Sequence, residues 1–220
     1  MVYHEGPARL VDGCVQVAGQ HIGSERIIIT TGARPALPGI PGIADVSPLD
    51  STTALALTEL PRSMIVLGGG YIGVELAQTF ARAGVEVTLV FRSRLLPEAE
   101  PEIGAALATY LADEGIKIVS GITYESARKT DDGGVALAIA RDGRPEILTA
   151  ERILVATGRR SNTEALGLAE TGIDLTPAGA IIVDDRMRTS KAGVYAAGEV
   201  TGKDKFVYMA ASGAKLAAKN

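Results

Sequence analysis

The chain has 220 residues, an apolar share of 46%, a single cysteine and a formal net charge of −4 at pH 7. This length allows one large domain or two small ones, and the slightly negative charge argues against a nucleic-acid or membrane-surface partner. We expect neither a signal peptide nor a membrane span, and the lone Cys14 excludes an internal disulfide and favours a reducing cytoplasm.

The first quarter of the chain predicts short strands, turns and a linker. Residues 1–29 end in Arg26–Ile29, an apolar run typical of a buried strand. Residues 35–48 contain four prolines and two glycines, which excludes regular structure and indicates an ordered linker. Residues 50–53 are Asp, Ser and two Thr, which are types that cap helices, so we expect a short helix over Ala54–Leu57. A domain boundary is therefore expected near residue 60.

A glycine-rich turn follows the apolar run Met64–Leu67, which has the length of one buried strand, and a helical pattern begins directly after it. Gly68, Gly70 and Gly73 have the spacing G-x-G-x-x-G. The first glycine makes the tight turn, the second lets a pyrophosphate touch the backbone, and the third lets the helix lie close to the strand. The free N–H groups and the positive dipole end of the helix would face the phosphates. Because a second strand is expected over Val85–Val90, we interpret this unit as a dinucleotide site; the alternative is a glycine-rich turn without a ligand.

The alternation of strand and helix continues beyond this unit. A loop with two arginines precedes a helix near Glu102–Glu114, and Ile116–Val119 is the next strand. Short runs separated by turns that contain Asp-Gly then predict an antiparallel meander: Thr123–Arg128, Val135–Ala140 and Pro145–Leu148. Arg152–Ala156 is predicted as another buried strand.

One pattern occurs twice. Ile27–Pro35 and Ile153–Arg160 each read as a buried strand that runs into a Thr-Gly turn. Small residues after a strand let the chain turn sharply and keep a nucleotide close. The two copies flank the glycine turn, which suggests crossing points between two nucleotide-binding domains; the alternative is the coincidence of two common strand ends.

The last third of the chain contains a carboxylate in a suggestive position. Residues 189–200 predict a turn, a short apolar strand and the step Gly198-Glu199, and Phe206–Lys219 predicts an alanine-rich helix. A carboxylate at a strand end beside a helix N-terminus can accept a hydroxyl of a ribose or ribitol chain. The alternative is an acid that caps a helix.

Together these motifs resemble the flavin-dependent pyridine nucleotide–disulfide oxidoreductases, the family of lipoamide dehydrogenase, glutathione reductase and mercuric reductase. The resemblance covers nearly the whole chain, and the tail 205–213 is most similar to mercuric reductase. It implies an α/β fold, with a Rossmann-like NAD(P)-binding domain made of a parallel sheet plus an antiparallel β-meander, and part of a FAD-binding domain. The expected domains are 1–59 (partial FAD-binding domain and linker), 60–164 (NAD(P)-binding domain) and 165–220 (C-terminal part of the FAD-binding domain).

The resemblance also implies roles for single residues. Tyr71 matches an aromatic lid over the flavin that nicotinamide displaces, and Glu75 matches a glutamate that pairs with a lysine beside the flavin. An ordinary aromatic at a helix start and a charge on a helix face are the structural alternatives. Glu199 matches the second FAD contact, where the family usually has Asp. The expected catalytic residues are Tyr71 and Glu75, no metal ligand is expected, and the expected cofactor-binding residues are Gly68, Gly70, Tyr71, Ile72, Gly73, Arg92, Arg94, Thr157, Gly158, Arg159, Thr31, Gly32, Gly198 and Glu199.

The charge at the end of the second strand predicts the cofactor. An NAD-selective site places Asp or Glu there, whereas this chain has Arg92 and Arg94 and no acid in Val90–Arg94. Arginine suits a 2′-phosphate because its planar fork makes charge-assisted bonds to phosphate oxygens. We therefore expect NADPH to be preferred over NADH; the alternative is a pair of arginines that only solvates a loop.

The resemblance further implies that NADPH reduces FAD, which passes electrons through a disulfide to substrate; the expected substrate is Hg²⁺, as in mercuric reductase. A lipoamide dehydrogenase-like or glutathione reductase-like enzyme is the alternative within the family, and a non-catalytic nucleotide-binding module is the alternative from another class. The family's FAD fingerprint, its C-x-x-x-x-C pair and its C-terminal His–Glu pair have no match in the chain. We therefore expect an internal segment of a homodimeric parent enzyme, inactive by itself.

Overall fold

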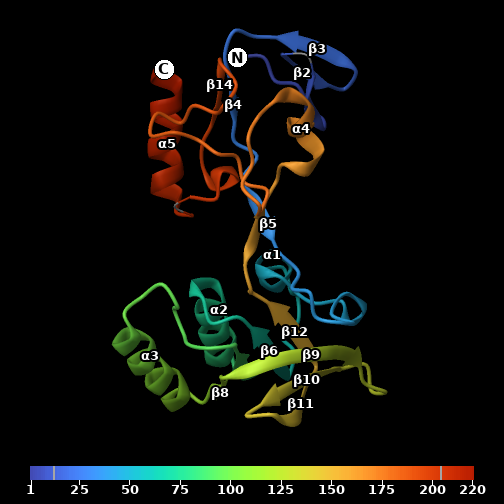
Figure 1. The fold of residues 1–220 in the computed structure, drawn as a ribbon. Helices are drawn as coiled ribbons and strands as arrows, with labels where there is room; N and C mark the ends of the chain where they lie inside the picture. Colours follow the sequence, from blue (N-terminus) through green and yellow to red (C-terminus); the bar gives the residue numbers. More distant parts are fainter. Residues whose placement is uncertain (12, 204) are drawn as a thin grey trace. The chain divides into compact units, whose positions relative to one another are not determined.

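The computed structural model describes residues 1–11, 13–203 and 205–220 (Figure 1). They form two compact units, one of residues 35–158 and one of residues 1–34 together with 159–220. The chain passes from one unit to the other at Arg34–Pro35 and again at Gly158–Arg159. Each passage directly follows one of the two Thr-Gly turns that the sequence suggests as crossing points.

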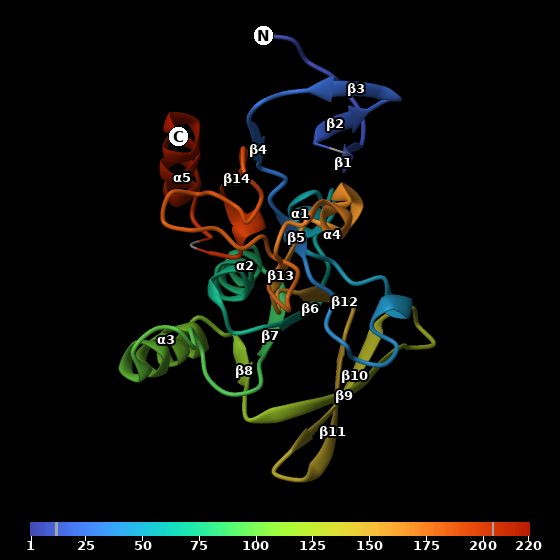
Figure 2. The ribbon, with the colours of Figure 1, turned by 45° about the horizontal axis from the view of Figure 1, so that its top comes forward.

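The unit of residues 35–158 is built on a parallel sheet of four strands: β6 (Ser63–Leu67), β7 (Glu86–Val90), β8 (Lys117–Val119) and β12 (Arg152–Val155). Their spatial order is β12-β6-β7-β8 (Figure 2). All four strands are confirmed to within one residue at either end. Long apolar runs are typical of parallel strands, which are covered on both faces.

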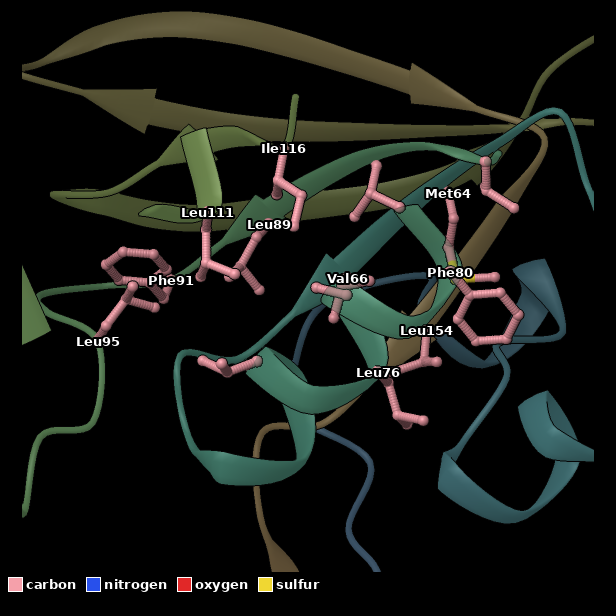
Figure 3. Close-up of a cluster of buried hydrophobic side chains, with 14 of the residues drawn as sticks. Met64, Val66, Leu76, Phe80, Leu89, Phe91, Leu95, Leu111, Ile116 and Leu154 are labelled. Atoms are coloured by element: carbon pink, nitrogen blue, oxygen red, sulfur yellow. The ribbon is translucent and has the colours of Figure 1, made fainter. Parts of the chain in front are cut away.

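Two helices cover one face of this sheet, α2 (Tyr71–Arg82) and α3 (Pro101–Asp113). Side chains alternate between the two faces of a strand, and Met64 and Val66 of β6 point to the helical side. There they meet Phe80 of α2, and Leu111 of α3 lies in the same buried cluster (Figure 3). The helical pattern predicted after the glycine turn is confirmed, and its apolar residues Leu76, Ala77 and Phe80 are all buried.

An antiparallel meander covers the other face: β9 (Ile122–Lys129), β10 (Val135–Arg141) and β11 (Arg144–Ala150) (Figure 2). Ile65 and Leu67, the alternate side chains of β6, are buried in one cluster with Leu137 and Ile139 of β10. The meander is therefore confirmed. Its β10–β11 turn has positive φ at both Asp142 and Gly143, as a tight two-residue hairpin requires.

The linker is ordered, as expected. Its short 3₁₀ turn η1 (Ala44–Val46) is preceded by Gly42, where a β-carbon would overlap the carbonyl oxygen of Ala127 on β9. The expected bounds of the next helix are wrong, because α1 spans Ser51–Leu55. It begins three residues earlier since the Asp50 carboxylate accepts the N–H groups of Thr52 and Thr53 and thereby caps the helix at that point.

The unit of residues 1–34 and 159–220 combines small sheets with short helices. An antiparallel sheet contains β1 (Ala8–Val11), β2 (Cys14–Val17) and β3 (Gln20–Gly23). Two further pairs are β4 (Ile27–Ile29) with β14 (Val194–Ala196), in parallel, and β5 (Ala33–Pro35) with β13 (Arg159–Ser161). The short helices are η2 (Glu164–Leu166), α4 (Leu168–Thr171) and η3 (Glu199–Thr201), followed by α5 (Val207–Lys219).

The pattern of the sequence indicates most of these elements but not all of them. The expected helix over Phe206–Lys219 is confirmed, with Phe206 as the residue just before its first turn. In contrast, η2 and α4 have no prediction, because they are too short for a periodic pattern and are defined by Leu166 and Leu168 entering the core of this unit. Among the described residues, no helix is long and apolar enough to cross a membrane.

Candidate dinucleotide site

The turn between β6 and α2 requires glycine at two positions for steric reasons. Gly68 has φ +119°, and a β-carbon there would overlap the carbonyl oxygen of Ala156. At Gly73, in the first turn of α2, a β-carbon would overlap the carbonyl oxygen of Gly68. Gly70 differs, because a β-carbon there would have no heavy atom within 4 Å. The first and third glycines thus bring helix and strand together, and the second leaves the backbone open.

The start of α2 offers hydrogen-bond donors without internal partners. Gly70 is the N-cap residue, no side chain caps the helix, and no acidic residue lies in its first turn. The first N–H groups of a helix have no acceptor within the helix, and the dipole places partial positive charge there. Ile72 directs a half-buried side chain into the core, which leaves its backbone N–H as the group available to a ligand. An anionic group such as a pyrophosphate fits this cradle.

The glycine turn lies where ligands bind in open α/β sheets. Since β6, β7 and β12 are parallel, their carboxyl ends share one edge. The chain proceeds from β6 to β7 on one side, whereas β12 pairs on the other side, so a topological switch point lies between β6 and β12. Thr157 and Gly158 follow β12 at this point and are exposed, next to the turn at Gly68.

The two arginines after β7 are exposed at the same edge but differ in their contacts. Arg94 donates to the carbonyl oxygen of Pro97 at 2.5 Å. Arg92 makes no hydrogen bond or ion pair with any described residue. No residue of 91–97 is acidic. The local charge therefore favours an anionic ligand group.

The two expected catalytic residues are both accessible. Tyr71 is the first residue of α2, with an exposed fraction of 49%. Glu75 lies one turn further along the helix and is also exposed, and it pairs with no lysine among the described residues. Their roles toward a flavin stay predictions.

In the unit of residues 1–34 and 159–220, a residue that the sequence reasoning missed supports the first Thr-Gly turn. The Thr31 hydroxyl donates to the Asn162 carbonyl oxygen at 2.8 Å, the Asn162 amide Nδ2 donates to the Thr31 carbonyl oxygen at 2.9 Å, and the Asn162 N–H donates to Gly32 at 2.9 Å. The Thr31 hydroxyl hydrogen is thus used within the protein. The available signal is the position of Asn162, four residues after Gly158 of the second Thr-Gly turn.

Glu199, the expected second FAD contact, forms an ion pair with Arg159, another expected cofactor-binding residue. Arg159 Nε lies 3.1 Å from one Glu199 carboxylate oxygen, and its Nη2 donates to the other at 3.2 Å and to the Ala33 carbonyl oxygen at 2.6 Å. The pair lines a pocket of about 320 Å³. Gly198, just before it, has φ +79°. A carboxylate has lone pairs for more than one donor, so a ribitol hydroxyl would share these oxygens with Arg159.

An exposed carboxylate in the same unit should make the stability of the fold depend on pH in the acidic range. Glu164 accepts two hydrogen bonds from Arg34, at 2.7 and 3.0 Å, and these lower the pKa of its carboxyl from 4.5 to about 2. A lowered pKa stabilises the fold above the unfolded value of 4.5, and this contribution is lost as the pH falls through about 2. We expect the difference in thermal midpoint between wild type and Glu164→Gln to shrink across this window, as measured by circular dichroism. A difference that is the same at neutral pH and in acid would contradict the expectation.

Comparison with known proteins identifies the family. Residues 3–217 match the family model described as pyridine nucleotide-disulphide oxidoreductase. The chain is 40% identical over 98% of its length to a mercuric reductase of Staphylococcus aureus, and 39% identical over 94% to a dihydrolipoyl dehydrogenase of Thermus scotoductus. It covers 40% and 45% of these two proteins.

A solved structure gives the same answer for the fold. The HOCl-induced flavoprotein disulfide reductase RclA from Escherichia coli is 34% identical, with a TM-score of 0.85 over 96% of this chain and 48% of that one. The chain thus spans less than half the length of these relatives. With a family model that matches nearly from end to end, and with the glycine turn that a dinucleotide requires, the chain belongs to the pyridine nucleotide-disulphide oxidoreductase family.

Proposed function

We propose that this chain is the NADPH-binding part of a flavin-dependent oxidoreductase, together with part of its FAD-binding domain. The proposed parent enzyme passes reducing equivalents from NADPH to FAD and on to a disulfide or thiol centre, with Hg²⁺ as the proposed final acceptor. NADPH and FAD are its proposed small-molecule partners, and a homodimer is its proposed state.

One observation carries the nucleotide-binding proposal. At the turn between β6 and α2, added β-carbons would overlap backbone oxygens at Gly68 and Gly73 but would meet open space at Gly70. A turn that served only packing would not need an open second glycine. This arrangement brings a helix N-terminus close to a strand end while leaving room for a pyrophosphate.

The residues of the chain would bind and orient the cofactors. In the unit of residues 35–158, the N–H groups at the start of α2 would hold the pyrophosphate, with Thr157 and Gly158 beside them. One of the two arginines after β7, Arg92 or Arg94, would hold the 2′-phosphate. In the other unit, Thr31, Gly32, Arg159, Gly198 and Glu199 would lie beside the flavin. Tyr71 would cover the flavin until nicotinamide enters, and Glu75 would pair with a lysine from outside the described residues. The nicotinamide and flavin themselves supply the two-electron chemistry, and the protein places and shields them.

Mercuric ion as the acceptor is supported by the relatives rather than by the site. Six mercuric reductases are 38–41% identical to the chain, but the dihydrolipoyl dehydrogenase at 39% is equally similar. A lipoamide- or glutathione-type disulfide is therefore the second candidate. The complete open reading frame decides between them: a C-terminal vicinal Cys-Cys and NADPH-dependent loss of Hg²⁺ support the first, and turnover of a small disulfide without Hg²⁺ turnover contradicts it.

Direct titration of the 220-residue chain tests the cofactor proposal. We expect NADPH to bind at least about tenfold more tightly than NADH, because a charge-assisted hydrogen bond from arginine to a phosphate contributes about 1.5–3 kcal/mol. Isothermal titration calorimetry with both nucleotides measures the ratio. Equal affinities would refute the preference, and the absence of binding by either nucleotide would refute the nucleotide site itself.

A non-catalytic nucleotide-binding module is the alternative from another class. It predicts nucleotide binding by the chain but no reduction of an external acceptor by the complete protein reconstituted with FAD. The enzyme proposal predicts NADPH oxidation that depends on acceptor under the same conditions. Stopped-flow absorbance of the flavin distinguishes the two.

A further inference from the structure

The carbonyl oxygen of Val90, the last residue of β7, accepts two hydrogen bonds. One comes from the N–H of Gly68, the first glycine of the turn, at 2.9 Å. The other comes from the hydroxyl of Tyr124 on β9, at 3.1 Å. The first belongs to the ladder between parallel strands, whereas the second comes from a side chain of the meander. The Val90 carbonyl oxygen is therefore hydrogen-bonded to both the glycine turn and the meander. Arg92 lies two residues after Val90, in the loop of residues 91–97, called the arginine loop below.

The far end of the arginine loop is also bonded to the glycine turn. The N–H of Leu96 donates to the carbonyl oxygen of Gly69 at 2.7 Å, and Leu96 is buried in a left-handed conformation with φ +44°. Between these two ends, a β-carbon at Gly69 would lie 3.0 Å from the Phe91 ring and 3.1 Å from the Arg94 carbonyl oxygen. Residues 91–96 therefore lie directly against the turn. Arg92 is exposed within this segment, which is hydrogen-bonded to the turn on either side of it, at Val90 and at Leu96.

The environment of Tyr124 keeps its hydroxyl a hydrogen-bond donor. Burial raises its pKa to about 12, and the positive charge of Arg92 acts on the pKa in the opposite direction. The hydroxyl is therefore protonated at neutral pH, with its hydrogen directed at Val90.

The two arginines are not equivalent in this arrangement. Arg94 already uses its guanidinium within its own loop, on the carbonyl oxygen of Pro97. Arg92 has no hydrogen bond or ion pair to another described residue, so its donors can be offered to a ligand without breaking a contact.

We propose that Tyr124 is a positioning residue for recognition of the 2′-phosphate of NADP(H), and that Arg92 rather than Arg94 contacts this phosphate. Tyr124 holds the end of β7, and with it the direction in which Arg92 leaves the strand. Arginine binds phosphate through a planar fork, so its contribution depends on orientation. This inference rests on the proposed binding of NADPH.

The test compares Tyr124→Phe with the wild-type 220-residue chain by calorimetric titration of NADPH and NADH. The variant keeps the ring and removes only the hydroxyl. We expect NADPH to bind about fivefold more weakly, the effect of one neutral hydrogen bond, and NADH to change less than about twofold. Tyr110→Phe is the matched control, because Tyr110 is 65% exposed on α3, and it should change neither affinity. Thermal unfolding of each variant verifies that it folds.

A double-mutant cycle separates positioning from a general structural effect. Arg92→Ala should remove most of the preference for NADPH, Arg94→Ala should retain most of it, and Tyr124→Phe should have no further effect on the ratio once Arg92 is absent. The inference is overturned if Tyr124→Phe weakens both nucleotides equally, if its effect persists in the Arg92→Ala background, or if Arg94 carries the preference. A wild-type chain that binds neither nucleotide refutes the proposed function first and the inference with it. Binding without any effect of Tyr124 refutes the inference alone.

Discussion

Gly70→Ala should abolish most of the NADPH binding and leave the fold intact. The added methyl group would meet no protein atom within 4 Å, and Gly70 has φ −82°, a conformation open to alanine. It would instead occupy the space where we propose that the pyrophosphate approaches the backbone. Losing one or two charge-assisted hydrogen bonds predicts an affinity about 10- to 100-fold lower. Calorimetric titration measures the loss, and the thermal midpoint should stay within a few degrees of wild type.

Gly73→Ala is the informative contrast, because its methyl group would meet protein. It would overlap the carbonyl oxygen of Gly68, so α2 would have to move away from β6. We expect a loss of about 1–3 kcal/mol in the free energy of unfolding together with the loss of NADPH binding. Gly39→Ala is the matched control for Gly70→Ala. A β-carbon at Gly39 would also meet nothing within 4 Å, but Gly39 lies in the linker, so this variant should keep its NADPH binding. Undiminished NADPH binding by Gly70→Ala would contradict the dinucleotide site.

Replacement of both Arg92 and Arg94 by serine should remove the preference for NADPH. Both side chains are exposed and extend from the carboxyl edge of the sheet, with no acid in residues 91–97 to oppose a phosphate. We expect NADPH to bind at least about tenfold more weakly, while NADH changes less than about twofold because it lacks the 2′-phosphate. Titration of both nucleotides measures the two effects separately.

The control for this experiment removes the same charge elsewhere in the same unit. Arg141 and Arg144 are exposed at the turn between β10 and β11, which is formed by the residues between them. Their replacement by serine should leave the ratio of the two affinities unchanged, apart from a small effect of net charge that added salt screens. If the variant without Arg92 and Arg94 keeps its NADPH affinity, these arginines only solvate the loop, and the cofactor preference has another origin.

The parallel strands, the two long helices and the meander of residues 35–158 are predictable from the sequence alone, and so is the family. Long apolar runs identify the parallel strands because both of their faces are buried, and Asp-Gly residues identify the tight turns of the meander. The motif around Gly68 is recognisable because its three glycines have a fixed spacing directly after an apolar run of strand length. Local chemistry also sets the start of α1 directly after the Asp50 cap, whereas treating all of residues 50–53 as capping residues predicted a later start. Short elements such as α4 escaped prediction, since they have no period and are stabilised by the core that they enter.

Which side chains meet depends on the tertiary structure. It joins Asn162 to Thr31, which lies 131 positions away, and to Gly32. It also pairs Arg159 with Glu199, an ion pair that the sequence does not predict. It also brought Tyr124 to Val90, which distinguishes two arginines that look alike in the sequence. The physical reason is range: a glycine's φ, a cap or a strand period is settled within a few residues, whereas a hydrogen bond between distant segments exists only once the sheet has set their register.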